Sequence, residues 1–379
     1  MKLLSIIIPT KNRQKYCLSA VHQILSLNYN DIEIVIRDNS DEDTLYAQLL
    51  PSIEQGKIIY EHFDGTVSFV DNFSKSIELC SGKYVCMIGD DDGILPNILD
   101  VVSLAEKEGY DAIIPGYNSV FIWPSPTPIV KGAENGYLCL SYLKNRSSIA
   151  NPTTALRKLL NNGGQNYMNY DLPRLYHGLV KRDVLDKIKK NTGNYFGGLT
   201  PDIYMSVALA LTCNKVLRLY YPITISGICP QSGASNSATG KHTGNLEDAP
   251  HFKGHNNYVW DSKIAPFYSV ETIWAETTLH ALNDFKRTDL YNSFNHEAVN
   301  GMCYLKYPQY RSLIIDCIKR NNSFVAKVVF YSYVKHAMTF FKKVLKRVCR
   351  SREDVCKYYD VNDIQNAVFI TKDFLQHLR

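Results

Sequence analysis

The sequence contains no pair of cysteines at CxxC spacing, although ten cysteines are spread along its 379 residues. Single, scattered cysteines argue against a zinc site and against a disulfide framework, so we expect a protein of the reducing cytoplasm. The sequence also lacks a run of about 18 apolar residues, the length at which a membrane-spanning helix becomes a candidate. With 42 basic and 37 acidic residues the formal net charge is only +5, so we expect no nucleic-acid partner.

Glycine-rich phosphate-binding loops are missing as well. The loop after the first apolar run, Pro9–Arg13, has no glycine, whereas a dinucleotide-binding dehydrogenase needs glycines there so that the backbone can approach a pyrophosphate. No GxxxxGKS or GxxxxGKT sequence occurs, which argues against a P-loop enzyme. If the chain binds a nucleotide, its diphosphate must be held in another way.

The first 115 residues alternate between strand-like and helix-like patterns. Apolar runs predict strands at residues 3–8, 32–36, 57–62, 84–89 and 111–115, and apolar residues at helical spacing lie between most of them. This alternation is typical of an α/β fold with a mostly parallel sheet covered on both faces. In such sheets ligands bind beyond the carboxyl ends of the strands.

Three adjacent carboxylates, Asp90–Asp92, directly follow the fourth apolar run. Clustered acids repel one another, and a divalent cation among them would relieve the repulsion. Oxygen ligands suit Mg²⁺ or Mn²⁺, and Mg²⁺ sites often include substrate phosphates. The alternative is an acidic turn before a helix that opens at Pro96. Asp38 closes the second predicted strand at the same expected edge, with a simple strand-to-turn exit through Asn39 and Ser40 as its alternative.

The rest of the chain is less regular. Proline-rich residues 123–128 and glycine- and asparagine-rich residues 161–164 and 232–244 predict long loops. A helix is predicted after Pro201, and the tail beyond residue 265 is predicted to be mostly helical. We expect a nucleotide-binding domain at residues 1–115, an acceptor-binding and catalytic region at 116–264, and a helical C-terminal region at 265–379.

Three segments in linked order resemble family 2 glycosyltransferases with the GT-A fold, the type found in bacterial surface-polysaccharide synthesis. They are Ser5–Arg13 (SIIIPTKNR), Ile34–Ser40 (IVIRDNS) and Gly82–Asp92 (GKYVCMIGDDD), and the likeness covers roughly residues 1–120. The resemblance implies a GT-A-like nucleotide-binding domain, followed here by a loop-rich acceptor region and a helical C-terminal region.

The resemblance also implies a set of nucleotide-binding residues. By this likeness Pro9, Thr10 and Asn12 line the nucleotide site, and Asp38 accepts a hydrogen bond from the base. Asn72 matches a helical position that faces the nucleotide, with an ordinary helix-surface residue as the alternative.

The acidic triplet corresponds to the motif that holds the ribose and the metal-bound diphosphate. We expect Asp90 to contact the nucleotide, and Asp91 and Asp92 to supply metal ligands for Mn²⁺ or Mg²⁺, with Asp91 as first choice. The family often has an aspartate where this chain has Gly89, so which carboxylate binds the metal stays open. Arg13 is given no role beyond neutralising nearby acids.

Glycosyl transfer to an acceptor hydroxyl needs a general base. The segment Gly197–Met205 resembles the family's second acidic motif, which implies Asp202 as that base; the alternative is an acid in a first helical turn, stabilised by the helix dipole. His177 is the second candidate, although a lone histidine in an apolar segment is more often structural. Lys241 and His242 could close over the diphosphate as a lid, with a solvated loop as the alternative.

The expected function is that of an inverting, metal-dependent glycosyltransferase. Its donor would be a nucleoside diphosphate sugar, with UDP-sugars as first choice, and its acceptor a saccharide or a lipid-linked saccharide. Two alternatives stay open. A nucleotidyltransferase usually has a glycine-rich, basic N-terminal loop, which is missing here, and a non-catalytic nucleotide-sugar-binding protein would have lost its base.

Residues 331–350 predict a basic amphipathic helix. Such helices lie in membrane interfaces with anionic lipid, so we expect either peripheral contact at the inner face of a membrane or a helix docked on the protein core. The apolar stripe is Val334, Met338, Phe341, Leu345 and Val348, and the basic side is Lys343, Lys346, Arg347 and Arg350.

Overall fold

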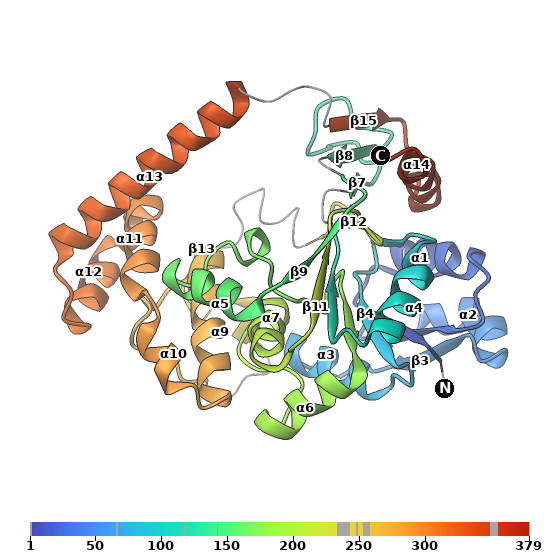
Figure 1. Cartoon of the computed structure of the whole chain (residues 1–379), viewed down its shortest axis with the longest axis horizontal. Helices are drawn as coiled ribbons and strands as arrows, with labels where there is room; N and C mark the ends of the chain where they lie inside the picture. The colour runs from blue at the N-terminus through green and yellow to red at the C-terminus, as the bar shows by residue number, and fades with distance from the viewer. Residues whose placement is uncertain are drawn as a thin grey trace.

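A computed structural model of the protein has one large sheet at its centre (Figure 1). It describes residues 2–65, 67–116, 119–141, 143–232, 243–247, 249–252, 258–348 and 355–378. The large sheet has eight strands in the order β3-β2-β1-β4-β10-β6-β11-β9. Their bounds are β1 Leu4–Thr10, β2 Ile32–Asp38, β3 Ile58–His62, β4 Tyr84–Met87, β6 Ala112–Ile114, β9 Ser147–Ala150, β10 Leu179–Lys181 and β11 Val216–Leu219.

The large sheet is mostly parallel, as predicted. β1 pairs in parallel with β2 and β4, β2 with β3, and β6 with β11. β10 runs antiparallel to its neighbours β4 and β6, and β9 runs antiparallel to β11. The predicted class, an α/β fold with a mostly parallel central sheet and a helical C-terminal region, is confirmed.

Alternating side chains of the central strands enter two hydrophobic cores. In β1, Ile6 and Ile8 belong to one core and Ile7 to the other, because successive residues of a strand point to opposite faces. Both faces are therefore covered, which explains why β1 and β2 are buried along their whole length. One face carries α1 Gln14–Ser26, α2 Thr44–Glu54 and α4 Ile98–Glu108, and the other carries α3 Phe69–Glu78, α6 Arg182–Thr192 and α7 Pro201–Thr212.

The strands and helices predicted in the first 115 residues are confirmed, with small shifts at their ends. α4 ends at Gly109, whose φ of 70° is the left-handed conformation that terminates many helices. α4 begins at Ile98, so Pro96 precedes the helix and does not open it. Helix α2 was not predicted.

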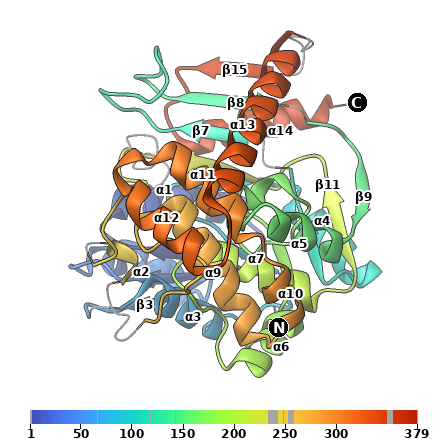
Figure 2. The same ribbon diagram turned by 90° about the vertical axis from the view of Figure 1, so that its left-hand side faces the viewer.

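A second sheet of five strands lies beside the large one, in the order β15-β8-β7-β12-β5. Helix α14 Ile364–Gln376 packs against it, and Phe121, Trp123 and Ile364 share one core there. The C-terminal residues thus return to the N-terminal part of the chain (Figures 1 and 2). The strands are β5 Gly93–Ile94, β7 Ser119–Ile122, β8 Tyr137–Ser141, β12 Thr224–Ile228 and β15 Val355–Tyr359.

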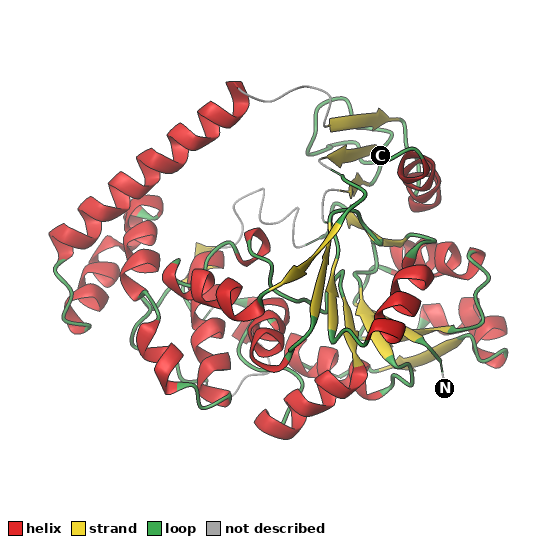
Figure 3. Cartoon of the chain, in the orientation of Figure 1, coloured by secondary structure: helices red, strands yellow, loops and turns green. Residues whose placement is uncertain are grey.

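The remaining helices form the region opposite α14 in Figure 3. Their core is continuous with that of α7, because Leu279, Val299 and Ile314 belong to the same cluster as Ile203. The prediction of a mostly helical tail holds for this region, although it missed β15. The helices are α5 Pro152–Asn161, α9 Val270–Asp284, α10 Thr288–Ser293, α11 His296–Lys306, α12 Arg311–Arg320 and α13 Val325–Val348, with a short ribbon of β13 Thr243–Gly244 and β14 Tyr268–Ser269 and 3-10 turns at Tyr167–Asn169, Pro250–Phe252 and Pro308–Tyr310.

Candidate active site

The carboxyl ends of β1, β2 and β4 bring the predicted acids to one edge of the large sheet. Thr10 is the register partner of Asp38, and on the other side of β1 the register pairs Ile7 with Met87. The Thr10 hydroxyl donates a hydrogen bond of 2.6 Å to Oδ2 of Asp90. Asp38 and the acidic triplet therefore lie on either side of Thr10, at the carboxyl ends of the strands as expected.

Asp38 is fully buried at the end of β2. Its Oδ1 accepts the backbone N–H of Ser40 at 2.8 Å, and its Oδ2 lies 2.9 Å from the hydroxyl of Tyr60. Burial, and then the hydrogen bond to Asp43, raise the pKa of Tyr60, so this hydroxyl stays protonated. Asp38 thus forms the strand-to-turn exit that was the alternative to a binding role. Its carboxylate also lies at the carboxyl end of the parallel strands, where ligands bind in such sheets.

The loop after β1 is fastened to the loop after β2. Asn12 has a φ of 55°, and its backbone N–H donates to Oγ of Ser40 at 2.8 Å. The side chain of Asn12 exchanges two hydrogen bonds with Asp41, at 2.8 and 3.0 Å. Asn12 therefore shapes the loop after β1 by holding Asp41, and Pro9 is buried near the end of β1.

The guanidinium group of Arg13 contacts both carboxylate oxygens of Asp90. Nη2 lies 2.7 Å from Oδ1 and Nε donates to Oδ2 at 3.0 Å, the forked geometry that favours arginine over lysine. Burial raises the pKa of Asp90 to about 7, against the opposing effect of Arg13. Arg13 does neutralise local acids, and it does so as a fixed partner of Asp90, a pairing that no local sequence pattern indicates.

Asp91 and Asp92 are tied to β12 and to the second sheet. The backbone carbonyl of Asp91 accepts the indole N–H of Trp123 at 2.8 Å, and its Oδ2 accepts the N–H of Cys229 at 2.9 Å. Oδ1 of Asp92 accepts the N–H of Gly227 at 2.6 Å. These contacts join residues far apart in the sequence, so no local motif could have revealed them.

Oδ2 of Asp92 has three further neighbours. It accepts the N–H of Gly89 at 2.6 Å and the Tyr176 hydroxyl at 3.0 Å, and it lies 3.2 Å from Nε2 of His177. Burial alone would raise the pKa of Asp92, but His177 and these hydrogen bonds hold it below its usual value. The other ring nitrogen of His177 lies 2.8 Å from the Thr224 hydroxyl. His177 therefore supports Asp92, which suits a structural role better than that of a base.

The position of Tyr176 explains why glycine, and not a larger residue, stands at position 89. A Cβ atom at position 89 would lie 2.6 Å from the hydroxyl oxygen of Tyr176. A side chain such as aspartate at this position would need Tyr176 to move. Tyr176 is thus part of the site in this chain, and sequence reasoning missed it.

The described residues contain no group of three or more His, Cys, Asp or Glu side chains placed to hold a metal ion. Both oxygens of Asp92 are occupied by protein donors, and both oxygens of Asp90 face Arg13. Within the described part of the chain, hydrogen bonds to the Asp91 carboxylate reach only Oδ2. One free carboxylate oxygen suits Mg²⁺ or Mn²⁺ when phosphate oxygens and water complete the shell, so the expectation of a metal rests on Asp91 and no longer on Asp92.

Asn72 is buried in α3, with 8% of its surface exposed. Its Oδ1 receives no hydrogen bond from the described residues. A buried polar atom without a partner is costly, so the alternative of a helix-surface residue does not describe Asn72. Its oxygen is available to a ligand.

Asp202 lies in the first turn of α7, directly after Pro201. The hydroxyl of Tyr167 donates to its Oδ2 at 3.0 Å, and burial raises the pKa of Asp202. Among the described residues no hydrogen bond joins Asp202 to the acidic triplet. The loop before α7 packs on the helix that carries Asn72, because Phe196 meets Phe73 of α3 edge to face with ring centroids 6.0 Å apart.

The glycine pair before Asp202 is tightly packed. A Cβ atom on Gly197 would lie 2.7 Å from the ring of Tyr204, and one on Gly198 would lie 2.8 Å from Thr277. Gly198 also has a φ of 66°, which glycine adopts without strain. Lys241 and His242, the expected lid, lie outside the described residues.

Comparison with known proteins agrees with this arrangement. The family model described as "Glycosyl transferase family 2" matches residues 5–156. The putative colanic acid biosynthesis glycosyl transferase WcaA of Escherichia coli is 34% identical over 109 residues, which is 28% of this chain and 38% of that protein. The GalNAc(5)-diNAcBac-PP-undecaprenol beta-1,3-glucosyltransferase of Campylobacter jejuni is 30% identical over 115 residues, 29% of this chain and 36% of that one.

The chain therefore spans well under half the length of these two curated relatives. Among solved structures, TarS of S. aureus in complex with UDP-GlcNAc is 13% identical, with 86% of this chain and 93% of that chain covered and a TM-score of 0.47. The family match covers the strands that carry Thr10, Asp38 and the acidic triplet. Residues 5–156 of this chain are thus similar to glycosyl transferase family 2.

Proposed function

We propose that this protein transfers a sugar from a nucleoside diphosphate donor, first of all a UDP-sugar, to a saccharide or lipid-linked saccharide during cell-surface polysaccharide synthesis. The observation that carries the proposal is the meeting of Asp38 and the acidic triplet around Thr10, inside the segment that matches the family. The names of the Escherichia coli and Campylobacter jejuni relatives support the polysaccharide and the lipid-linked acceptor.

In this proposal the donor's diphosphate lies beside Asp91. A divalent ion held by Asp91 would stabilise the negative charge that develops on the leaving diphosphate. The role of Asp92, with Gly89, Gly227 and His177, is to keep the loop of the triplet in place. Arg13 pairs with Asp90 and also lies 3.8 Å from Oδ2 of Asp91, so in this proposal Oδ1 of Asp91 holds the ion.

The general base in this proposal is Asp202. Burial raises its pKa, and a carboxylate with a raised pKa is a better proton acceptor near neutral pH. The Tyr167 hydroxyl orients the carboxylate through Oδ2, which leaves the other oxygen to approach an acceptor hydroxyl.

A donor screen tests the proposed function. The protein is incubated with UDP-, GDP- and dTDP-sugars with and without Mn²⁺, and thermal shift and release of nucleoside diphosphate are measured. We expect one donor class to stabilise the protein and to be hydrolysed slowly only when the metal is present. A protein that neither binds nor hydrolyses any nucleotide sugar would contradict the proposal, and pyrophosphate release from nucleoside triphosphates would point to a nucleotidyltransferase instead.

Helix α13 supports a proposed contact with the inner face of a membrane. Its Val328 and Ser332 are buried, and Ser332 lies against Gly301 of α11, so the first half of the helix is docked. The opposite face is exposed and apolar. It carries Phe330, Tyr331, Val334, Met338, Phe340 and Phe341, each at least 40% exposed.

Exposed lysines border this apolar face. Lys327 and Lys342 are exposed on α13, and apolar area beside basic side chains favours anionic interfaces. No helix in the described ranges is both long and apolar enough to span a bilayer. The side chains of residues 343–348 and all of residue 350, which include Leu345, Val348 and the predicted basic side, lie outside the described residues.

Vesicle sedimentation tests the membrane contact. We expect binding to phosphatidylglycerol vesicles to fall about tenfold when Phe340 and Phe341 are both changed to Ser, with little binding to phosphatidylcholine in either case. Unchanged binding to anionic vesicles would contradict it. Point substitutions are needed because a deletion from residue 324 would also remove β15 and α14, which pack on β8 and on the strand after the acidic triplet.

A further inference from the structure

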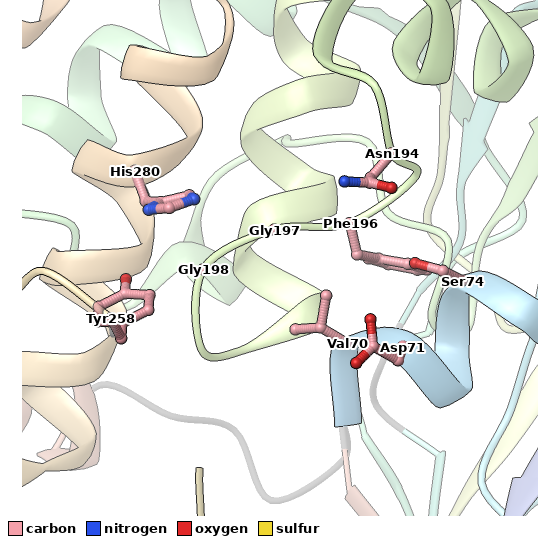
Figure 4. Close-up of a pocket in the computed structure, with 9 residues that line it drawn as sticks. All are labelled: Val70, Asp71, Ser74, Asn194, Phe196, Gly197, Gly198, Tyr258 and His280. Carbon is pink, nitrogen blue, oxygen red and sulfur yellow. The ribbon is translucent and has the colours of Figure 1, made fainter. Parts of the chain in front are cut away.

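A hollow of about 250 Å³ lies between α3, the loop that leads into α7, and α9. Figure 4 shows Tyr258 and His280 on one side of the glycine pair, and the residues of α3 with Asn194 and Phe196 on the other. The hollow is lined by Val70, Asp71, Ser74, Asn194, Phe196, Gly197, Gly198, Tyr258 and His280.

The walls of the hollow link Asp202 with the proposed nucleotide edge, which is the end of the large sheet that carries Thr10, Asp38 and Asp90–Asp92. Asn39, which follows Asp38, donates through Nδ2 to the carbonyl of Gly65 at 2.9 Å, and Ser68 then caps α3 by accepting the N–H of Asp71 at 3.0 Å. The wall formed by α3 is therefore fastened to the end of β2. The glycine pair leads directly through Leu199 and Thr200 into the helix of Asp202.

The floor of the hollow is backbone with a fixed shape. Gly197 packs closely against the ring of Tyr204, and Gly198 packs closely against Thr277. The N–H of Leu199 donates to Oγ1 of Thr277 at 3.2 Å, which anchors the loop to α9. A floor that is already ordered lowers the entropy lost when a ligand binds.

The chemistry of the lining suits a saccharide. Tyr258 stacks on His280 at 5.6 Å with 18° between the ring planes, which gives a flat surface for the C–H face of a sugar ring. Asp71, Ser74 and Asn194 offer a carboxylate, a hydroxyl and an amide to sugar hydroxyls. Among the residues that the structure describes, neither lysine nor arginine lines the hollow, which favours a neutral ligand over a diphosphate.

The size of the hollow agrees with one sugar ring. Small-molecule sites usually have volumes of about 300–1,000 Å³, so a hollow of about 250 Å³ is a small one. It suits a single pyranose ring.

We propose that this hollow binds one pyranose unit of the acceptor, a hexose or an N-acetylhexosamine, and presents its hydroxyl toward Asp202. The proposal rests on the proposed function, because it names the acceptor's place in the same reaction. The nucleotide and its diphosphate bind elsewhere, at the edge formed by β1, β2 and β4.

The test fills the hollow and compares transfer with hydrolysis. Ser74→Trp places a large ring in the hollow, and Lys75→Trp is the matched control because Lys75 is the next residue of α3 and its side chain is 61% exposed. Transfer to a panel of p-nitrophenyl hexosides and N-acetylhexosaminides is measured with the donor that the parent hydrolyses. We expect kcat/KM for the glycoside to fall at least about tenfold in Ser74→Trp, with donor hydrolysis and UDP affinity unchanged and with Lys75→Trp like the parent.

A second variant covers the case in which Ser74→Trp does not fold. Asn194→Ala removes an exposed amide and should raise KM for the glycoside about threefold without changing kcat. Unchanged transfer in both variants, or an equal loss of UDP binding, would overturn the proposal. So would a parent that hydrolyses its donor yet accepts no glycoside of the panel, whereas a parent without any donor hydrolysis would contradict the proposed function itself.

Discussion

The carboxylates at the nucleotide edge and the carboxylate of Asp202 differ in how many protein groups hydrogen-bond to them. Asp92 accepts hydrogen bonds from two backbone N–H groups and from Tyr176, and it lies beside His177. In the described part of the chain, Tyr167 is the one side chain that donates to Asp202. The nucleotide edge is thus preorganised by many contacts. The pKa of Asp202 is raised by burial and lowered by its own backbone N–H and by one side-chain hydroxyl, that of Tyr167. Substitutions at the nucleotide edge should therefore act by displacing the acidic loop. Substitutions around Asp202 should act by changing or removing its proton-accepting group.

Gly227→Ala should have the largest effect. A Cβ atom at position 227 would lie 1.7 Å from the carbonyl oxygen of Asp91, so β12 or the acidic loop must move. We expect a loss of about 3 kcal/mol of unfolding free energy and no measurable UDP binding, by urea denaturation and calorimetric titration. Gly244→Ala is the control, because no atom lies within 4 Å of its Cβ position; a Gly227→Ala variant that behaves like this control would contradict the tight contact.

Asp202→Asn should leave the fold and the nucleotide edge intact and remove the proposed general base. A positioned general base contributes about 10²–10⁴-fold, so we expect kcat for transfer to fall by about 10³ while UDP affinity stays the same. Steady-state kinetics with a titration of UDP measures both. Turnover close to that of the parent would exclude Asp202 as the base.

Tyr167→Phe should have a smaller effect and change the pH profile. The hydrogen bond from Tyr167 lowers the pKa of Asp202, against the larger effect of burial. Without this hydroxyl the pKa rises, so the acidic limb of the kcat profile should move to higher pH, and activity at pH 6 should fall about tenfold. An acidic limb that stays in place would mean that another group titrates.

Glu276→Gln should have the smallest effect, confined to stability. Burial raises the pKa of Glu276 in α9 to about 8, so the folded protein holds a proton that the unfolded chain releases above about pH 4.5. Stability from this group is present below that pH and is lost as the pH rises toward 8. Urea denaturation should show that the parent loses about 3 kcal/mol more than Glu276→Gln between pH 5 and pH 8; parallel losses would contradict the buried, protonated state.

The features of the site that depend on local sequence pattern could be predicted from the sequence. Apolar runs and helical spacing predicted β1, β2, β4, α3 and α7, and the parallel sheet placed Asp38 and Asp90 at one edge. Helix α2 was missed, and Pro51 inside it is the residue that a helical pattern does not predict.

The other half depends on contacts between segments far apart in the chain. Gly227 and Cys229 reach the acidic triplet from β12, and Tyr176 fills the space that Gly89 leaves. Arg13 has an ordinary sequence context, and only the folded chain shows which carboxylate it pairs with. The return of β15 and α14 to the second sheet is likewise set by packing, since Ile364 approaches Gly93 directly after the triplet.

A crystal structure of the protein with UDP and Mn²⁺ tests the central claim most directly. We predict the uracil beside Asp38, the diphosphate beside Asp91, and the ion between that carboxylate and the phosphate oxygens. Nucleotide density away from the ends of β1, β2 and β4, or bound UDP whose diphosphate does not approach the acidic triplet, would contradict it.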